Sequence, residues 1–320
     1  MTKTNNGQKK YKIPDYKADN IHNDWCPGCG DYGILSGIQM ALANLGLPPH
    51  EVAVISGIGC SGKTSHYINA YGFHTLHGRV VPNATGMKLA NHDLTVLGVG
   101  GDGDGYGIGA GHFVAGGRRN LDFTYVIFNN NIYALTKGQA SPTIGKGEQT
   151  KTMPEQSIYN PINPVALAIS SGYTFVAQSY ALDVKYTADI IARAIQHPGS
   201  AVVDVLQTCP AFNNLHTKTW FEGLDREEKQ PRLYKLEDEG YDGTVPEPEN
   251  PDSVSKTKAA AIEKALASKN GRIPVGVFYE HRTATLEDYL SKKIPALAST
   301  SMVKMDIYDR DISPLLDELR

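Results

Sequence analysis

Four cysteines stand where their thiolates could hold a metal or an iron–sulfur cluster. Cys26 and Cys29 form a C-P-G-C pair, whereas Cys60 and Cys209 are single residues in GIGCSGK and QTCPAF. A C-x-x-C turn serves both zinc sites and iron–sulfur clusters. Structural zinc more often uses two such pairs, whereas four thiolates that meet from separate segments suit a [4Fe–4S] cluster. Structural zinc and unrelated core cysteines are the alternatives.

A second set of residues could bind a phosphate-bearing cofactor through Mg²⁺. Asp102 lies in GGDGDGYGIG directly after the apolar run TVLGVG, and Asn130 follows 28 positions later in FNNNIY. Mg²⁺ takes octahedral oxygen ligation, commonly from a carboxylate, neutral oxygens and phosphate oxygens. Gly101, Gly103 and Gly105 let the backbone approach a diphosphate closely. Taken separately, the two segments could be only a tight turn and a loop. Within the asparagine run, the spacing favours the middle residue.

The segment GIGCSGKT at 57–64 also matches the phosphate-binding loop pattern GxxxxGK[ST], and it follows an apolar run. In a nucleotide-hydrolysing protein, Lys63 would contact the β- and γ-phosphates and Thr64 would bind Mg²⁺. Such a loop does not need Cys60, and this interpretation leaves the GDGDG segment, the asparagine run and the other cysteines unexplained. Nucleotide binding therefore stands as the alternative function.

The elements that position these residues are predicted from hydrophobic periodicity. Apolar runs predict strands at 52–57, 95–100, 123–129, 173–179 and 201–209, and helices are predicted at 31–45, 82–92, 107–118, 164–171 and 184–196. Apolar strands separated by helices predict an α/β fold, a parallel sheet with helices on both faces. Ligands bind such sheets at the carboxyl ends of the strands. Cys60, Asp102, Asn130 and Cys209 all follow predicted strands.

Three parts are expected along the chain. Residues 1–20 are polar and predict an N-terminal arm, residues 21–214 form the main α/β domain, and residues 215–320 form a C-terminal extension that could dock a partner. Within the extension, 222–257 is rich in charge and proline and predicts an exposed loop. A helix at 255–267, a strand at 273–279 and short helices near 285–292 and 313–319 could form an appended lobe.

Composition excludes some partners. The 320 residues carry 31 Lys and Arg against 34 Asp and Glu without a long basic run, so neither nucleic acid nor an anionic membrane is an expected partner. No stretch approaches the roughly 18 consecutive apolar residues of a membrane span, and the polar start has no signal-peptide core. We therefore expect a cytoplasmic protein, in which disulfides are not expected.

The motifs together resemble a known family. GDG followed by NN resembles the signature of thiamine-diphosphate enzymes. WCPGCGDYGIL, SGIGCSGK, YGFHTLHGR, GGDGDGYGIG, NNNIYALTKGQASPT and QTCPAFN, in this order over 24–214, resemble the β-subunit of 2-oxoacid:ferredoxin oxidoreductases. The resemblance implies the diphosphate-type domain of the thiamine-diphosphate-binding fold, with thiamine diphosphate, Mg²⁺ and a [4Fe–4S] cluster as cofactors. It also implies oxidative decarboxylation of a 2-oxoacid with coenzyme A to acyl-CoA and CO₂, the electrons passing through the cluster to ferredoxin. HTLHGR and NPVALAI favour 2-oxoglutarate or broad specificity over pyruvate.

The resemblance also assigns residues. It makes Cys26, Cys29, Cys60 and Cys209 the cluster ligands, and it makes the side chains of Asp102 and Asn130 and the backbone oxygen of Ile132 the Mg²⁺ ligands. It places Ile58, Gly59, Cys60, Ser61, His77, Gly103, Asp104, Gly105 and Tyr106 around the cofactor. Two residues receive catalytic roles: Lys63 would face the substrate carboxylate, with a solvated lysine as the alternative, and Leu135 would lie near the reactive end of the cofactor. His74 and Arg79 could contact phosphate or serve packing.

The family further implies partners. An α-subunit would supply the pyrimidine-binding domain with its catalytic glutamate, which gives a heterodimer or a larger hetero-oligomer. The sequence has no C-x₂-C-x₂-C-x₃-C run, so the electrons are expected to leave to a separate ferredoxin. Two other classes stay open: a thiamine decarboxylase without iron, and a zinc-binding structural subunit without thiamine diphosphate.

Overall fold

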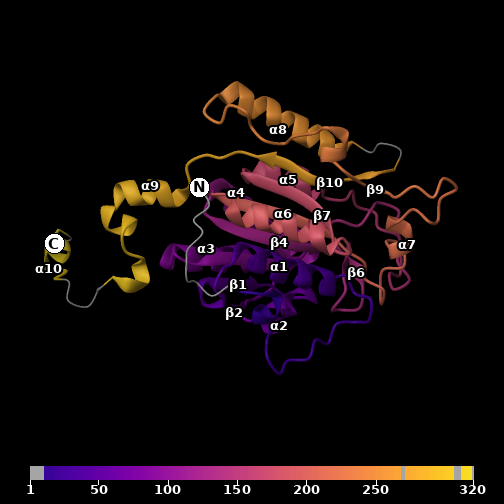
Figure 1. Cartoon of the computed structure of the whole chain (residues 1–320), viewed down its shortest axis with the longest axis horizontal. Coiled ribbons are helices and arrows are strands. Elements are labelled where there is room, and N and C mark those ends of the chain that lie inside the picture. The colour runs from indigo at the N-terminus through magenta and orange to yellow at the C-terminus, as the bar shows by residue number, and fades with distance from the viewer. Residues whose placement is uncertain (1–10, 268–270, 306–310, 319–320) are drawn as a thin grey trace.

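One eight-stranded sheet runs through the centre of the computed structural model, which describes residues 11–267, 271–305 and 311–318 (Figure 1). The strand order is β2-β1-β3-β4-β8-β7-β10-β9. The strands are β1 (Val52–Ser56), β2 (Tyr71–His74), β3 (Thr95–Gly101), β4 (Phe123–Asn129), β7 (Phe175–Tyr180), β8 (Ser200–Leu206), β9 (Leu233–Lys235) and β10 (Ile273–Glu280). From β2 to β7 all neighbours are parallel, whereas β10 pairs antiparallel with β7.

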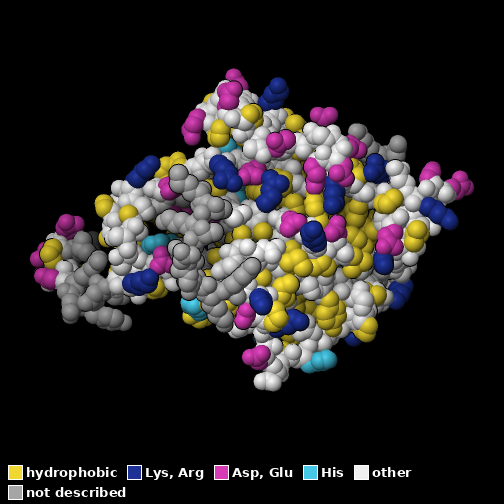
Figure 2. Space-filling model, in the orientation of Figure 1, with side chains coloured by type: hydrophobic (Ala, Val, Ile, Leu, Met, Phe, Trp, Pro, Cys, Tyr) yellow, Lys and Arg dark blue, Asp and Glu magenta, His cyan; other side chains and the backbone are white. Residues whose placement is uncertain are grey.

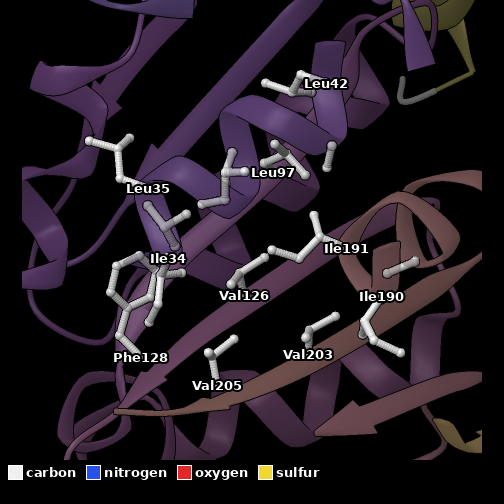
Figure 3. Packing of buried hydrophobic residues seen from close by; sticks show 14 of the residues in the cluster. Ile34, Leu35, Leu42, Leu97, Val126, Phe128, Ile190, Ile191, Val203 and Val205 are labelled. Carbon is white, nitrogen blue, oxygen red and sulfur yellow. The ribbon is translucent and has the colours of Figure 1, made fainter. Parts of the chain in front are cut away.

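Helices cover both faces of this sheet, as expected from its apolar strands. The α-helices are α1 (Asp31–Leu45), α2 (Thr64–Tyr67), α3 (Val80–Ala90), α4 (Ala110–Arg119), α5 (Pro164–Ser171), α6 (Val184–Gln196), α7 (Lys218–Phe221), α8 (Pro251–Leu266), α9 (Leu286–Lys293) and α10 (Ser313–Asp317). On one face, α1 and α6 pack together over β3, β4 and β8; Figure 3 shows Ile34, Val126 and Ile191 in this core. On the other face lie α3, α4, α5 and α8.

Consecutive strand residues enter different cores because side chains alternate across a strand. In β1, Val52 and Val54 face α1, whereas Ala53 and Ile55 face α3. All residues of β1 and β4 are buried, which is typical of parallel sheets covered on both sides. Figure 2 shows charged side chains of both signs interspersed on the face that carries α1.

The predicted fold class is confirmed, and most element boundaries agree within a few residues. The helix predicted at 107–118 is two elements, a π-helix over Gly103–Ile108 (η4) and then α4, with non-helical backbone at Gly107. The strand predicted to reach residue 209 ends at Leu206, so Cys209 lies in the loop that follows. The small antiparallel pair β5 (Ile132–Tyr133) and β6 (Gln139–Ala140) was not predicted.

The C-terminal part differs from the expected appended lobe. The strand predicted at 273–279 is β10, which pairs with β7 inside the main sheet, and α8 packs on α5. The stretch expected as an exposed loop contains β9, which is paired with β10. The sequence of a short apolar strand does not indicate which sheet it joins. Without β10, β7 would be an unpaired edge of the main sheet, and β10 covers that edge. After β10, the chain continues to α9 beyond the end of the sheet (Figure 1).

Polar contacts fix β10 at its last residue. Glu280 accepts hydrogen bonds from Arg193 on α6, at 3.1 Å, and from Arg282, at 3.0 Å. His197, whose side chain is fully buried, lies 3.9 Å from the same carboxylate. These partners, His197 first, lower the pKa of Glu280 to about 2. The antiparallel strand is therefore joined by charge to α6, as well as by its backbone ladder to β7.

The N-terminal arm lies outside the described residues for positions 1–10, but its second half does not behave as a free arm. Residues Ile13–Tyr16 form a 3₁₀ turn (η1), and the side chain of Tyr16 is fully buried. The Tyr16 hydroxyl lies within hydrogen-bonding distance of two backbone oxygens, those of Leu42 in the last turn of α1 and of Leu47 just after it. Within the described residues, no helix has the length and apolar composition needed to cross a membrane.

Candidate functional site

The carboxyl ends of β1, β3, β4 and β8 meet at one edge of the sheet and enclose a cavity of about 80 Å³. The cavity is lined by Ile58, Gly59, Cys60, Ser61, His77, Gly101, Asp102, Gly103, Asp104, Phe128, Asn130, Ile132, Tyr133, Ala134, Leu135, Thr136 and Gln207. The structure thus brings the predicted oxygen donors, one predicted cluster cysteine and the predicted reactive-end residue to a single place.

Asp102 enters this cavity from the end of β3 and is held by two hydroxyl groups. Its side chain is 1% exposed, and its Oδ2 accepts hydrogen bonds of 2.5 Å from Ser141 and from Thr143. Burial raises the pKa of Asp102, while the two hydroxyls and the backbone of Asn130 act in the opposite direction. A carboxylate buried in this way is positioned to meet a cation rather than water.

The three asparagines after β4 have different partners. Asn129 donates to both carboxylate oxygens of the buried Asp204, at 3.2 and 3.1 Å. Asn131 donates to Thr143 at 3.1 Å and has a backbone φ of 64°. Asn130 is the one that lines the cavity, and its Oδ1 accepts the backbone N–H of Ile132 at 3.0 Å. This arrangement supports the prediction that the middle residue serves as the ligand.

Asp104 has a role that the sequence did not reveal. Its Oδ1 accepts the backbone N–H groups of Ile58 at 3.0 Å and Gly78 at 2.8 Å, and His77 Nδ1 lies 2.7 Å away. The carboxylate therefore ties the loop after β1 to the loop before α3. A Cβ atom on Gly57 would lie 2.0 Å from Asp104 Oδ2, so the loop can approach the carboxylate only with glycine there.

Two residues predicted to surround the cofactor lie outside the cavity lining. Tyr106 points into the core beside Phe113, and its hydroxyl donates to Asp204 at 3.0 Å. Gly105 lies against Tyr125, whose hydroxyl would be 2.9 Å from a Cβ atom there. The π-helix turns these residues toward the sheet, which motif spacing alone could not indicate. Gly103 does line the cavity, where a Cβ atom would meet the Tyr133 ring at 2.2 Å.

Hydrogen bonds join the three segments that carry the cysteines. The Trp25 indole donates to the backbone oxygen of Cys60 at 2.8 Å. The backbone N–H of Gly30 donates to the backbone oxygen of Thr208 at 3.0 Å. Cys60 packs against the apolar cluster that contains Cys209. All four thiols are free; Cys26 is exposed, and Cys209 is buried. The segments therefore converge beside the cavity, and Cys60 belongs to both places.

The thiols and one buried acid influence each other electrostatically. Burial and then the negative charge of Asp31 raise the pKa of Cys29, and the same two causes raise the pKa of Cys60 to about 12. Burial raises the pKa of Cys209, to which Asp31 adds a smaller effect. The charges of Cys209 and Cys60 also raise the pKa of Cys29. Binding by a metal would have to displace the thiol protons.

The donors present fit the implied cofactors in chemical type. Carboxylate, amide and carbonyl oxygens suit Mg²⁺, whereas thiolates suit iron. Asp104 Oδ2 and Gln207 Oε1, both on cavity-lining residues, are buried and lack hydrogen-bond partners, so the site can accept donors from a ligand. Among the described residues, no three His, Cys, Asp or Glu side chains are placed to share one metal ion. In an iron–sulfur cubane each thiolate binds its own iron, so the thiols need not reach a common ion.

Lys63 lies outside the cavity lining and has a partner. Its Nζ donates to both carboxylate oxygens of Asp24, at 2.8 and 3.0 Å, and Tyr67 donates to the same carboxylate. Leu135 lines the cavity and is 45% exposed, in keeping with a position at its mouth. His74 Nδ1 lies 2.9 Å from His66 Nε2, and neither residue lines the cavity.

The geometry around residues 57–64 disfavours a nucleotide-binding loop. Thr64, which would have to bind Mg²⁺, is fully buried, and Lys63 is paired with Asp24. The helix that follows, α2, has only four residues. A phosphate-binding loop instead needs an open helix N-terminus facing the phosphates.

Comparison with known proteins agrees with the geometry. Residues 48–205 match the family model "Thiamine pyrophosphate enzyme, C-terminal TPP binding domain". Residues 209–293 match the family model for the C-terminal part of the pyruvate ferredoxin oxidoreductase beta subunit. Fold, cavity and family model together define a thiamine-diphosphate-binding domain.

Relatives narrow this class further. A 2-oxoacid:ferredoxin oxidoreductase subunit beta of Saccharolobus solfataricus is 50% identical over 86% of this chain and 87% of its own. Subunit beta of 2-oxoacid:ferredoxin oxidoreductase 1 of Aeropyrum pernix is 47% identical over 96% of this chain and 94% of its own. A solved 2-oxoglutarate:ferredoxin oxidoreductase from Magnetococcus marinus, described with 2-oxoglutarate, coenzyme A and succinyl-CoA bound, aligns with a TM-score of 0.83 at 34% identity over 98% of both chains. The chain belongs to the β-subunits of 2-oxoacid:ferredoxin oxidoreductases, and it is a subunit of an oxidoreductase.

Proposed function

We propose that this β-subunit binds the diphosphate end of thiamine diphosphate through Mg²⁺ and holds a [4Fe–4S] cluster on its four cysteines. The enzyme converts a 2-oxoacid and coenzyme A into acyl-CoA and CO₂, and the two electrons released reduce ferredoxin one at a time. The observation that carries the proposal is the position of Cys60, which lines the cavity and also packs beside Cys209. A cluster held there would lie beside the cavity proposed for thiamine diphosphate, where it could accept the electrons released from the 2-oxoacid.

The chain's own residues position and shield the reacting groups. Asp102, held by two hydroxyls, and Asn130 are the proposed side-chain ligands of Mg²⁺, with the backbone oxygen of Ile132 as a third. Asp104 fixes the loop of Ile58 and Gly59 over the cavity. When bound, thiamine diphosphate supplies the carbon nucleophile and electron sink that amino acid side chains lack.

The relatives support the proposed substrate and partners. The Magnetococcus enzyme is described with 2-oxoglutarate, which supports 2-oxoglutarate or a broader range of 2-oxoacids for this chain. The β-subunit name of the relatives implies an α-subunit, and we propose that it supplies the pyrimidine-binding domain. A separate ferredoxin is the proposed electron acceptor, and a cytoplasmic location stays a prediction.

The proposed docking role of the C-terminal extension needs a narrower test than removal of everything after residue 214. Because β9 and β10 belong to the main sheet, such a truncation would remove two of its strands and expose β7. Deletion of 286–320 begins at α9 and leaves the sheet intact. Loss of co-purification with the α-subunit would support the docking role, whereas full co-purification would contradict it.

The proposal is tested on protein purified anaerobically after co-expression with the α-subunit. Iron, acid-labile sulfide, zinc and thiamine diphosphate are measured together with the visible spectrum. We expect about four irons and four sulfides per β-subunit with bound thiamine diphosphate. Zinc without thiamine diphosphate would establish the structural-subunit alternative, and tight ATP binding without either cofactor would establish nucleotide binding.

A further inference from the structure

The side chain of Asn213 joins two loops that follow the neighbouring strands β4 and β8. Asn213 is 1% exposed and lies in the loop after β8, where its backbone N–H donates to the backbone oxygen of Cys209 at 3.0 Å. Its Nδ2 donates to the backbone oxygen of Asn130, in the loop after β4, at 2.9 Å. Asn213 does not line the cavity, so it can act on a ligand there only through Asn130.

This side-chain contact begins where the sheet ends. The backbone ladder between β4 and β8 finishes with the N–H of Gln207, which donates to the backbone oxygen of Asn129 at 2.9 Å. The next carbonyl along the chain, that of Asn130, is held by the amide of Asn213 instead. A buried carbonyl without a donor is unfavourable, and a peptide without such a bond is less well fixed. Asn213 therefore fixes the backbone of the residue whose side chain lines the cavity.

The amide of Asn213 has one orientation that satisfies its neighbours. Its Oδ1 accepts the backbone N–H groups of Leu215 and His216, at 3.0 and 3.1 Å, so Nδ2 must be the atom that faces Asn130. Nδ2 also lies 3.3 Å from Nδ1 of the His216 ring. The other ring nitrogen, Nε2, lies 3.2 Å from Glu148 Oε1. This contact with His216 is the largest cause that lowers the pKa of Glu148.

The His216 ring completes a chain of contacts that runs from Glu148 to Asn130. An ionised carboxylate can only accept hydrogen bonds, so Nε2 carries the ring proton and Nδ1 of the neutral imidazole accepts from Asn213. The ring packs edge-on against Trp220, with 4.6 Å between the ring centroids, and His216 is 8% exposed. Because Glu148 and Trp220 hold the ring, the ring in turn holds the amide of Asn213.

We propose that Asn213, oriented by His216, positions Asn130 to bind Mg²⁺, an inference that rests on the proposed metal site. A metal ligand binds well only when its own backbone and side chain are held in the right place. Residues that contact a metal ligand but not the metal typically change the metal affinity roughly 10- to 100-fold when they are removed. Asn213 and His216 act through Asn130, so both are positioning residues.

The test compares Asn213→Ser with the wild type in the anaerobically purified complex with the α-subunit, after removal of thiamine diphosphate and Mg²⁺. Serine adds no charge, and its hydroxyl can still accept a backbone N–H in the turn, but its side chain is too short to reach Asn130. Binding of thiamine diphosphate is measured by calorimetry over a series of Mg²⁺ concentrations. We expect the half-saturating Mg²⁺ concentration to rise at least about tenfold, with near-wild-type affinity for thiamine diphosphate at saturating Mg²⁺.

His216→Phe tests the other end of the chain of contacts. Phenylalanine keeps a ring beside Trp220 but cannot accept a hydrogen bond from Asn213, so the half-saturating Mg²⁺ concentration should rise by about threefold. Asn214→Ser is the matched control, because Asn214 is exposed in the same loop and its Oδ1 accepts the backbone N–H of Lys151. This control should keep the wild-type Mg²⁺ requirement.

Two results would overturn the inference while leaving the proposed function intact. One is an unchanged Mg²⁺ requirement in either Asn213→Ser or His216→Phe, at wild-type iron content. The other is a loss of affinity for thiamine diphosphate that persists at saturating Mg²⁺, because Asn213 would then shape the cavity as a whole and not the metal ligand. A wild-type complex that binds thiamine diphosphate without any need for Mg²⁺ would instead contradict the proposed metal site.

Discussion

Replacing Asp104 should show that the cavity depends on one buried carboxylate which ties two loops together. Asp104→Ala removes the acceptor for the N–H groups of Ile58 and Gly78. Each backbone donor left unpaired costs about 1–3 kcal/mol, or roughly 4 kcal/mol for the two. Removing the unpartnered Oδ2 recovers about 1 kcal/mol, and the half-exposed His77 can bond to water. The net loss of unfolding free energy should therefore be about 3 kcal/mol.

Urea unfolding of the β-subunit, followed by tryptophan fluorescence, measures this loss as a lower midpoint at unchanged slope. Asp104→Asn is the matched variant, since it keeps an oxygen for the two N–H groups and loses only the charge. It should lose about half as much stability, because hydrogen bonds to a neutral acceptor are weaker. An alanine variant within about 1 kcal/mol of the wild type would refute the reasoning, because the loops would then be held by other contacts.

Three further outcomes are expected. Asp102→Ala should abolish Mg²⁺-dependent binding of thiamine diphosphate in calorimetry while the iron content persists; full affinity would remove Asp102 from the metal site. Lys63→Met should raise KM for the 2-oxoacid with kcat little changed, and an unchanged KM would show that the pair with Asp24 is only structural. Because the pKa of Glu280 is lowered to about 2, its stabilising contribution is complete above about pH 4.5 and is lost as the pH falls toward 2. Glu280→Gln should thus be less stable than the wild type at pH 7. An equal loss of unfolding free energy at pH 7 and at pH 3 would show that the charge of Glu280 is not the cause.

The sequence predicted the parallel part of the fold well because its strands are buried on both faces. Continuous apolar runs separated by amphipathic helices leave few alternatives, and the helices at 31–45, 164–171 and 184–196 have the predicted bounds. The attachment of β10 could not be read in the same way. Strand order and direction at a sheet edge depend on contacts between distant segments, such as that of Glu280 with Arg193.

For the site, the residue types and their places after strands were enough to bring Asp102, Asn130 and Cys60 together. Side-chain direction was not predictable. Tyr106 turns into the core because a π-helix follows β3, and that element leaves no clear signal in a run of glycines. The hydroxyls of Ser141 and Thr143 stood inside a recognised motif, but their contact with Asp102 spans 39 and 41 positions of sequence.

The loop after β1 fixes the distance between the cavity and the thiol site. Ile58 at the cavity and Cys60 at the thiols are two residues apart, so the chain between them spans at most about 7 Å. Both positions sit on one loop, anchored by Asp104 at one end and by Trp25 at the other. A partner that moves against this chain would leave the spacing between Ile58 and Cys60 unchanged, so the proposed cofactor and cluster would keep their separation while substrate enters or product leaves.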